Sequence, residues 1–138
     1  MSTIYQRLGM RTFINARGTI TTLGGSIMPA EVVAAMVEAS RSFVHLNELH
    51  QKAGDRIAEL TGAEGAFISA GAASGLLLAG AAVLTGTDTE AIRNIPDVGD
   101  RPNEFAISLV DSHYYVHQGF RVCGGELVRV GTQQAVTL

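Results

Sequence analysis

An uncharged run of 23 residues, from Gly65 to Thr87, constrains the fold of this chain more than any other feature of its sequence. The run is longer than the ~18 apolar residues from which a membrane-spanning helix must be considered. Five glycines and several hydroxyl groups dilute its hydropathy, however, and the flanking residues Glu64, Asp88 and Glu90 are acidic instead of basic. We therefore interpret the run as a buried strand, a tight turn and a buried helix.

Strand and helix patterns alternate from this run to the end of the chain. We expect strands over residues 66–69, 105–110 and 126–130, and helices over residues 76–84 and 114–122. The polar segment 86–103 is interpreted as a surface excursion with one helical turn. A β-α-β-α-β order predicts an α/β fold with a mostly parallel sheet and crossover helices, and the sheet looks incomplete because buried parallel strands are normally flanked by more sheet.

The first part of the chain has a different pattern. Residues 13–26 are rich in glycine and threonine and are predicted to be extended or looped. A helix is expected from Pro29 to about Phe43, and a second one over residues 46–61 with Gly62 as its stop. We therefore divide the chain into a loop and helix segment, residues 1–45, and the first part of an α/β domain, residues 46–138.

Charge and cysteine content exclude several classes of function. Ten basic against 13 acidic residues give a net charge of −3, and no basic run is present, so binding of nucleic acid is not expected. The single cysteine, Cys123, excludes an internal disulfide framework and a multi-thiolate zinc site. The first eighteen residues contain no secretory signal, and we expect a cytoplasmic protein without membrane contact or bound metal.

The turn from the expected strand to the expected helix, Ser69 to Gly75, is the first candidate site. Its small residues would let a ligand approach the backbone, and the start of the helix would offer unpaired N–H groups to an anion, with Ser74 as a further donor. The sequence matches neither a nucleotide P-loop nor a dinucleotide fingerprint. Close packing of helix on strand would need the same small residues, so both interpretations stay open.

The second candidate site is the segment Asp111 to His117, just after the expected strand 105–110. Ligands of open α/β sheets gather at such strand ends, where an imidazole or phenol can stack on a flat cofactor or transfer protons. His113 and His117 are spaced for a shared metal, but a third ligand is missing. An exposed helix start with no ligand would have the same composition. Lys52 is expected to be an exposed lysine, and Cys123 a packed thiol.

Four segments in a fixed order carry a resemblance to a known family. They are INARGTITTLGGS at 14–26, MPAEVVAAM at 28–36, AGDRIAELTGAEGAFISAGAASGL at 53–76 and CGGELVRVGT at 123–132. Together they resemble the N-terminal part of fold-type I pyridoxal-phosphate enzymes. Within these, the chain is most similar to the selenocysteine-synthase-like group, which includes L-seryl-tRNA(Sec) selenium transferase and D-glucosaminate-6-phosphate ammonia-lyase.

The resemblance implies a fold, a cofactor and its ligands. The fold would be the first part of the large domain of the aspartate aminotransferase-like transferases, and the cofactor pyridoxal 5'-phosphate. Its phosphate would be bound by the amides of Gly71, Ala72 and Ala73, with Ser74 as a side-chain donor. His113 would stack on the pyridine ring, with Tyr114 and Tyr115 as alternates. The full-length relatives are generally homo-oligomers.

The same resemblance implies that one catalytic group lies outside this chain. The family forms a Schiff base with a lysine from a later part of the large domain, and Lys52 does not match that position. We therefore expect the N-terminal fragment of a longer lyase or transferase, inactive alone. It would act on an amino acid or amino sugar by elimination or replacement at the beta carbon.

The branch within this group and the alternative function can also be predicted from the sequence. The ammonia-lyase-like branch is favoured over the selenium transferase, because the loop TITTLGGS departs from the transferase pattern and no cationic surface for tRNA is present. The alternative function is a non-catalytic α/β module that binds a phosphorylated ligand or assembles with another subunit.

Overall fold

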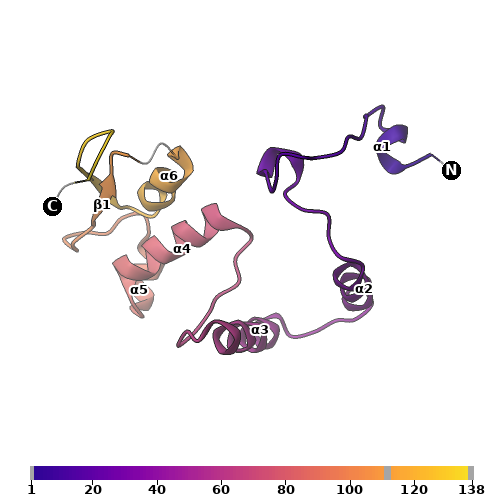
Figure 1. Cartoon of the computed structure of the whole chain (residues 1–138). Coiled ribbons are helices and arrows are strands. Elements are labelled where there is room, and N and C mark those ends of the chain that lie inside the picture. The colour runs from indigo at the N-terminus through magenta and orange to yellow at the C-terminus, as the bar shows by residue number, and fades with distance from the viewer. Residues whose placement is uncertain (1, 111–112, 137–138) are drawn as a thin grey trace. The chain divides into compact units, whose positions relative to one another are not determined.

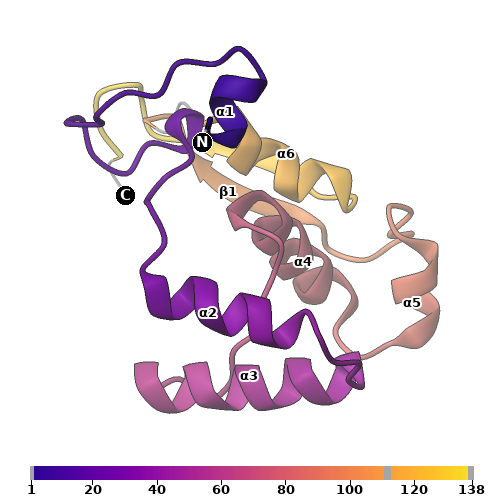
Figure 2. The same cartoon turned by 90° about the vertical axis from the view of Figure 1, so that its right-hand side faces the viewer.

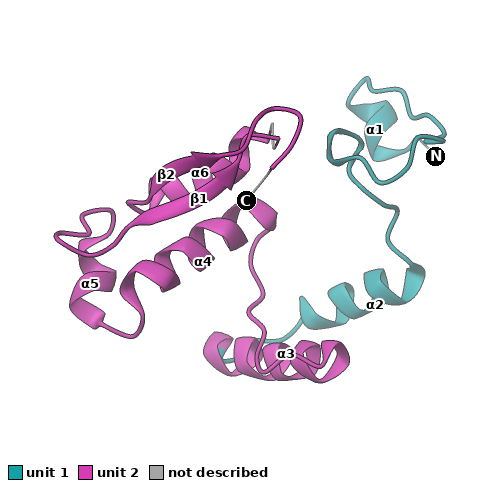
Figure 3. Cartoon of the chain, turned by 60° about the vertical axis from the view of Figure 1, so that its left-hand side comes forward, with its two compact units in different colours: residues 1–45 teal, residues 46–138 magenta. Residues whose placement is uncertain are grey.

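The computed structural model describes residues 2–110 and 113–136. The chain forms two compact units, Met1–His45 and Leu46–Leu138, which are coloured separately in Figure 3.

Short, locally stabilised elements make up the first unit. Helix α1 (Ile4–Arg7) begins with a capping box, in which the Thr3 hydroxyl accepts the Gln6 N–H at 3.2 Å and the Gln6 side chain accepts the Thr3 N–H at 2.8 Å. A 3-10 turn, η1 (Thr21–Leu23), is closed by an antiparallel bridge between Ile20 and Gly25. The predicted loop of residues 13–26 is thus confirmed, apart from this turn.

Helix α2 (Ala30–Ala39) follows Pro29, which lies at its N-cap, and Glu31 lies in its first turn. An acidic side chain is favourable there because the N-terminal end of a helix is electropositive. The helix ends four residues before the predicted end at Phe43. Its apolar side chains remain exposed, at 43–55% for Val32, Val33, Met36 and Val37.

The second unit contains four helices and two strands in the described residues (Figure 1). They are α3 (Leu46–Thr61), α4 (Ala72–Thr85), α5 (Thr89–Asn94), β1 (Glu104–Ser108), α6 (Tyr114–Val122) and β2 (Glu126–Val130). The predicted bounds of α3, α6 and β2 are confirmed. No described helix has the length and apolar character needed to cross a membrane.

Strands β1 and β2 form a parallel sheet (Figure 3), and α6, which lies beside β1 in Figure 2, provides the crossover between them. In this register Phe105 faces Leu127, and Ile107 faces Arg129. The ring of Phe105 stacks on Phe120 of α6, with the ring centroids 4.8 Å apart. The α/β class and the parallel pairing predicted from the sequence are therefore confirmed for these two strands.

The predicted strand over residues 66–69 is wrong. This segment is extended chain without strand pairing in the described structure, and the sheet contains only β1 and β2 there. A strand is stabilised by hydrogen bonds to a neighbouring strand, and none is beside this segment. Instead, Ala66 packs on α3, where an added Cβ at Gly54 would lie 2.3 Å from the Ala66 carbonyl oxygen, and Phe67 stacks on His50 at 5.1 Å.

Helices α4 and α6 pack closely because each helix places a glycine against the other. A Cβ added at Gly80 of α4 would lie 2.9 Å from the Cys123 sulfur, and one added at Gly119 of α6 would lie 3.0 Å from the Leu76 Cβ. Cys123 is fully buried in this contact, as expected for a packed thiol. Since Leu76 precedes Gly80 and Gly119 precedes Cys123, the two helices run in the same direction.

Candidate functional site

The turn before α4 depends on a glycine backbone. Gly71 forms the N-cap of α4 with φ 147° and ψ 173°, a region that residues with a Cβ rarely adopt. An added Cβ at Gly71 would meet no atom within 4 Å, so the glycine is required by the backbone angle and not by lack of space.

The carbonyl oxygen of Gly71 holds the turn together. It accepts the N–H of Gly75 at 2.9 Å and the hydroxyls of Ser69 and Ser74 at 2.9 and 2.8 Å. The single hydroxyl proton of Ser74 is therefore used within the turn. Ser74 could donate to a ligand only after rotating away from Gly71, and the other two donors would then keep the turn in place.

The N–H groups at the start of α4 are available to a ligand. Among the described residues, the N–H groups of Ala72, Ala73 and Ser74 donate to no backbone or side-chain oxygen. No acidic side chain lies in this first turn to neutralise its partial positive charge. The turn therefore fits a small anion such as a phosphate group.

The second candidate cluster surrounds the start of α6. His113 is the N-cap of α6, and its ring meets the Tyr115 ring edge-on at 5.6 Å. The Tyr114 ring meets His117 in the same way at 6.4 Å. His113, Tyr114 and Tyr115 are all exposed, while Asp111 and Ser112 lie outside the described residues.

The packing of α4 on α6 places these two clusters at the same end of the helix pair. The glycine contacts match position 76 of α4 to 119 of α6, and position 80 to 123. Continuing this match by one turn brings Ala72 level with Tyr115, because a helical turn spans about 3.6 residues. The starts of α4 and α6 therefore lie at the same end of the helix pair (Figure 1), and this brings the N–H groups of Ala72 to Ser74 near the aromatic residues of α6.

A cavity of about 410 Å³ lies at the same end of the sheet, lined by Ile107, Leu109, Val110, Tyr114, His117, Arg129 and Gln133. Arg129 is not among the candidates predicted from the sequence. The available signal was the parallel pairing, because the fourth residue of the second strand must share a sheet face with its partner, the fourth residue of the first.

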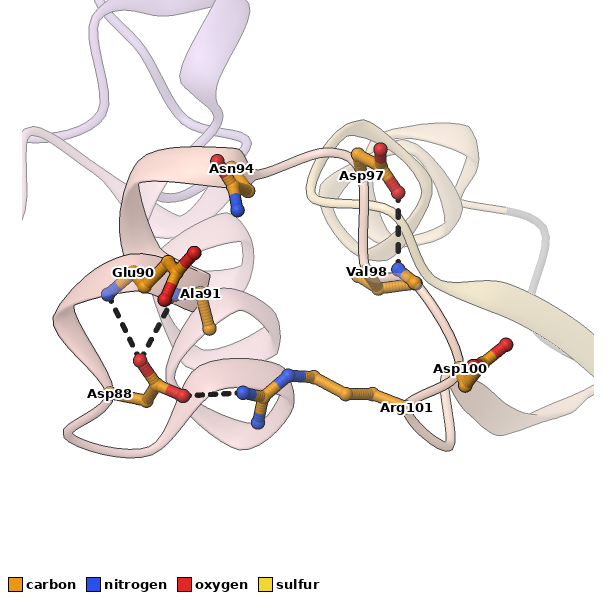
Figure 4. A pocket seen from close by; sticks show the side chains of 9 residues that line it. Asp88, Glu90, Ala91, Asn94, Asp97, Val98, Asp100 and Arg101 are labelled. Carbon is orange, nitrogen blue, oxygen red and sulfur yellow. Dashed lines mark hydrogen bonds and ion pairs between the residues drawn. The ribbon is translucent and has the colours of Figure 1, made fainter.

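Another cavity, of about 470 Å³, lies around α5 and the loop that follows it (Figure 4). Asp88 caps α5 by accepting the N–H groups of Glu90 at 2.9 Å and Ala91 at 3.2 Å. Its second carboxylate oxygen pairs with the Arg101 guanidinium at 2.5 Å. Through these contacts the Asp88 carboxylate connects the start of α5 to the loop that follows this helix, within the surface segment 86–103.

The same contacts lower the pKa of Asp88. The N–H of Ala91 has the largest effect, followed by the Arg101 side chain and the N–H of Glu90. Because the folded-state pKa lies below the unfolded value, the charged Asp88 stabilises the fold above the unfolded pKa of about 3.9, and this stability is lost as the pH falls through the folded pKa.

We expect Asp88→Asn to lower the free energy of unfolding at pH 7 and to have a smaller effect at pH 3. Urea unfolding of the 138-residue chain at both pH values measures this difference. Asp100→Asn removes a nearby exposed charge and is the matched control. An effect of Asp88→Asn that stays constant from pH 7 to pH 3 would contradict the structural role of the charge.

The remaining sequence candidates have local partners. Lys52 pairs with Glu48 at 2.8 Å and its side chain is 73% exposed, so the prediction of an exposed lysine is confirmed. His50 stacks on Phe67. Within the described residues, no group of three or more His, Cys, Asp or Glu side chains could hold a metal ion.

The described residues form an α/β unit whose candidate site combines unpaired N–H groups at the start of α4 with aromatic side chains at the start of α6. The chain is 38% identical over 131 residues to a 5'-C-glycyluridine monooxygenase-decarboxylase from Streptomyces sp, covering 92% of this chain and 33% of that protein. It is 35% identical over 137 residues to a D-glucosaminate-6-phosphate ammonia lyase from Salmonella typhimurium, covering 97% and 37%. No family model matches the chain.

A solved structure of a D-glucosaminate-6-phosphate ammonia-lyase superimposes on 99% of this chain with a TM-score of 0.91 and 34% identity, covering 38% of that chain. The resemblance predicted from the sequence is thereby confirmed: this chain and D-glucosaminate-6-phosphate ammonia-lyase are homologues. The chain spans about a third of the length of each of these relatives.

Proposed function

We propose that this chain is the cofactor-phosphate part of a longer, cytoplasmic, homo-oligomeric pyridoxal-phosphate enzyme. The observation that carries the proposal is the position of the free N–H groups of Ala72, Ala73 and Ser74, level with the aromatic start of α6. A phosphate group and a flat ring attached to it need this combination. The homology to an ammonia-lyase supports the same proposal.

Each residue of the site has a separate task in this proposal. The helix-start N–H groups bind the phosphate, and Gly71 supplies the backbone angle that directs them outward. His113 would stack on the ring of the bound cofactor, with Tyr114 and Tyr115 as alternates. The bound cofactor supplies an electron sink for a carbanion next to the substrate nitrogen. The lysine that binds the cofactor covalently is supplied from outside residues 1–138.

We further propose a lyase reaction on an amino sugar phosphate. An amino acid is the alternative substrate. The ammonia-lyase is matched both in sequence and in structure. The second relative bears the name of a different reaction, although it matches nearly the whole chain as well. Because two relatives with different names both match nearly the whole chain, we assign residues 1–138 to holding the cofactor and assign the choice of reaction to other parts of the complete protein.

The complete protein tests the cofactor assignment. On addition of pyridoxal phosphate we expect a new absorbance band near the visible edge, and borohydride should fix the cofactor to a lysine outside residues 1–138. The 138-residue chain is the control and should show no stoichiometric fixation at one equivalent of cofactor, because Lys52 is a 73% exposed surface lysine outside the proposed phosphate site. Failure of the complete protein to bind the cofactor would contradict the proposal and favour a non-catalytic module; fixation on Lys52 would contradict the assignment of the lysine.

A further inference from the structure

The cavity at the carboxyl ends of β1 and β2 has one charged wall and one apolar wall. Ile107, Leu109 and Val110 come from β1 and the residues after it and form the apolar side. Arg129 of β2 contributes a guanidinium group, and Tyr114 and His117 from α6 contribute a phenol and an imidazole, with Gln133 beside them. Its volume of about 410 Å³ is in the range of small-molecule sites.

The register of the sheet explains why a cation lies in this cavity. Arg129 is paired with Ile107, so both side chains project from the same face of the sheet. Ile107 is 7% exposed and is part of the core, whereas Arg129 lies one strand further out and is exposed. The cavity therefore continues from the apolar core to the guanidinium group.

Arg129 has no ion-pair partner among the described residues. In the part of the chain that the structure describes, the ion pairs join Lys52 to Glu48, Arg56 to Glu59 and Arg101 to Asp88, and no carboxylate lies within ion-pair distance of Arg129. A guanidinium group offers five N–H donors in a planar fork that matches a carboxylate or a phosphate. An unpaired guanidinium group in a cavity favours an anionic ligand.

We propose that this cavity binds a small organic anion, with its carboxylate or phosphate on Arg129 and its apolar part on Ile107, Leu109 and Val110. The site uses none of the residues Gly71 to Ser74 and does not use His113. It shares Tyr114 with the alternates proposed beside the cofactor ring, but it does not rest on phosphate binding by the turn before α4.

Titration of the isotope-labelled 138-residue chain with propionate and with propyl phosphate, followed by NMR, tests the proposal. We expect saturable shifts of the Arg129 side-chain N–H signal and of the Tyr114 and His117 rings, and none with propylammonium at equal ionic strength. The anion with the lower Kd identifies the preferred group. The amide signals of Ala72 and Ala73 report binding at the cofactor site separately, so the failure of one site is distinguishable from failure of the other.

Substitutions distinguish a built site from general attraction of anions. Arg129→Gln should weaken binding about tenfold or more, because hydrogen bonds between charged groups are stronger than those between neutral groups. Arg129→Lys keeps the charge but not the planar fork and should give an intermediate Kd. Arg121→Gln removes the same charge from the last turn of α6, outside the cavity, and should leave the Kd unchanged. Equal losses for Arg129→Gln and Arg121→Gln, or shifts confined to Ala72 and Ala73, would overturn the proposal.

Discussion

Replacement of Ala72 by proline is expected to weaken binding of pyridoxal phosphate to the complete protein about tenfold to a hundredfold. Ala72 is the first residue of α4, where proline fits the helix and removes only an N–H group that has no partner within the helix. If that N–H donates to the cofactor phosphate, its loss removes a charge-assisted hydrogen bond worth about 1.5–3 kcal/mol. Titration of the absorbance band with the cofactor measures the change in Kd.

The matched control is Thr89→Pro, which changes the same position of α5. Asp88 caps that helix through Glu90 and Ala91, so the N–H of Thr89 is not part of the cap. We expect both variants to unfold at nearly the same urea concentration as the unchanged protein, and only Ala72→Pro to lose cofactor affinity. An unchanged Kd for Ala72→Pro would show that the first turn of α4 does not bind the phosphate.

Gly124→Ala is expected to lower the free energy of unfolding by about 2–4 kcal/mol, the sum of a steric and a backbone contribution. Gly124 connects α6 to β2 with φ +100°, and an added Cβ would lie 2.3 Å from the carbonyl oxygen of Pro96 and 2.9 Å from the Val98 side chain. The nearer atom belongs to the backbone, so the loop after α5 would have to move. That movement would also strain the hydrogen bond from the Asn103 side chain to the Gly124 carbonyl, now 3.0 Å long.

Urea unfolding of the 138-residue chain measures this loss, and Gly99→Ala separates its two causes. Gly99 also has a positive φ, +56°, but an added Cβ there meets no atom within 4 Å. Its replacement should cost only the backbone contribution, about 1–2 kcal/mol. If the two variants were equally destabilised, the close approach of Pro96 to Gly124 would not limit the stability of the fold.

Local patterns in the sequence predicted the elements that depend on near neighbours. The bounds of α3, α6 and β2 follow from apolar spacing and from the breaks at Gly62 and at Gly124 with Gly125, and the structure has the same bounds. Helix α2 ends at Ala39 and not at Phe43, since none of its residues is buried in the described structure and no packing extends it. The segment 66–69 is apolar enough for a strand, but strand formation requires a partner that no local pattern supplies.

The sequence by itself determined which residues could carry the chemistry: a turn of small residues before a helix, and a histidine with two tyrosines after a strand. Only the tertiary structure decided that these groups share one end of the α4–α6 pair, because the direction of α4 relative to α6 depends on the contacts of Gly80 with Cys123 and of Gly119 with Leu76. The position of Arg129 was decided in the same way, by its pairing with Ile107 across the sheet. Contacts between residues distant in the chain are set by packing and strand register, which the local order of residues does not contain.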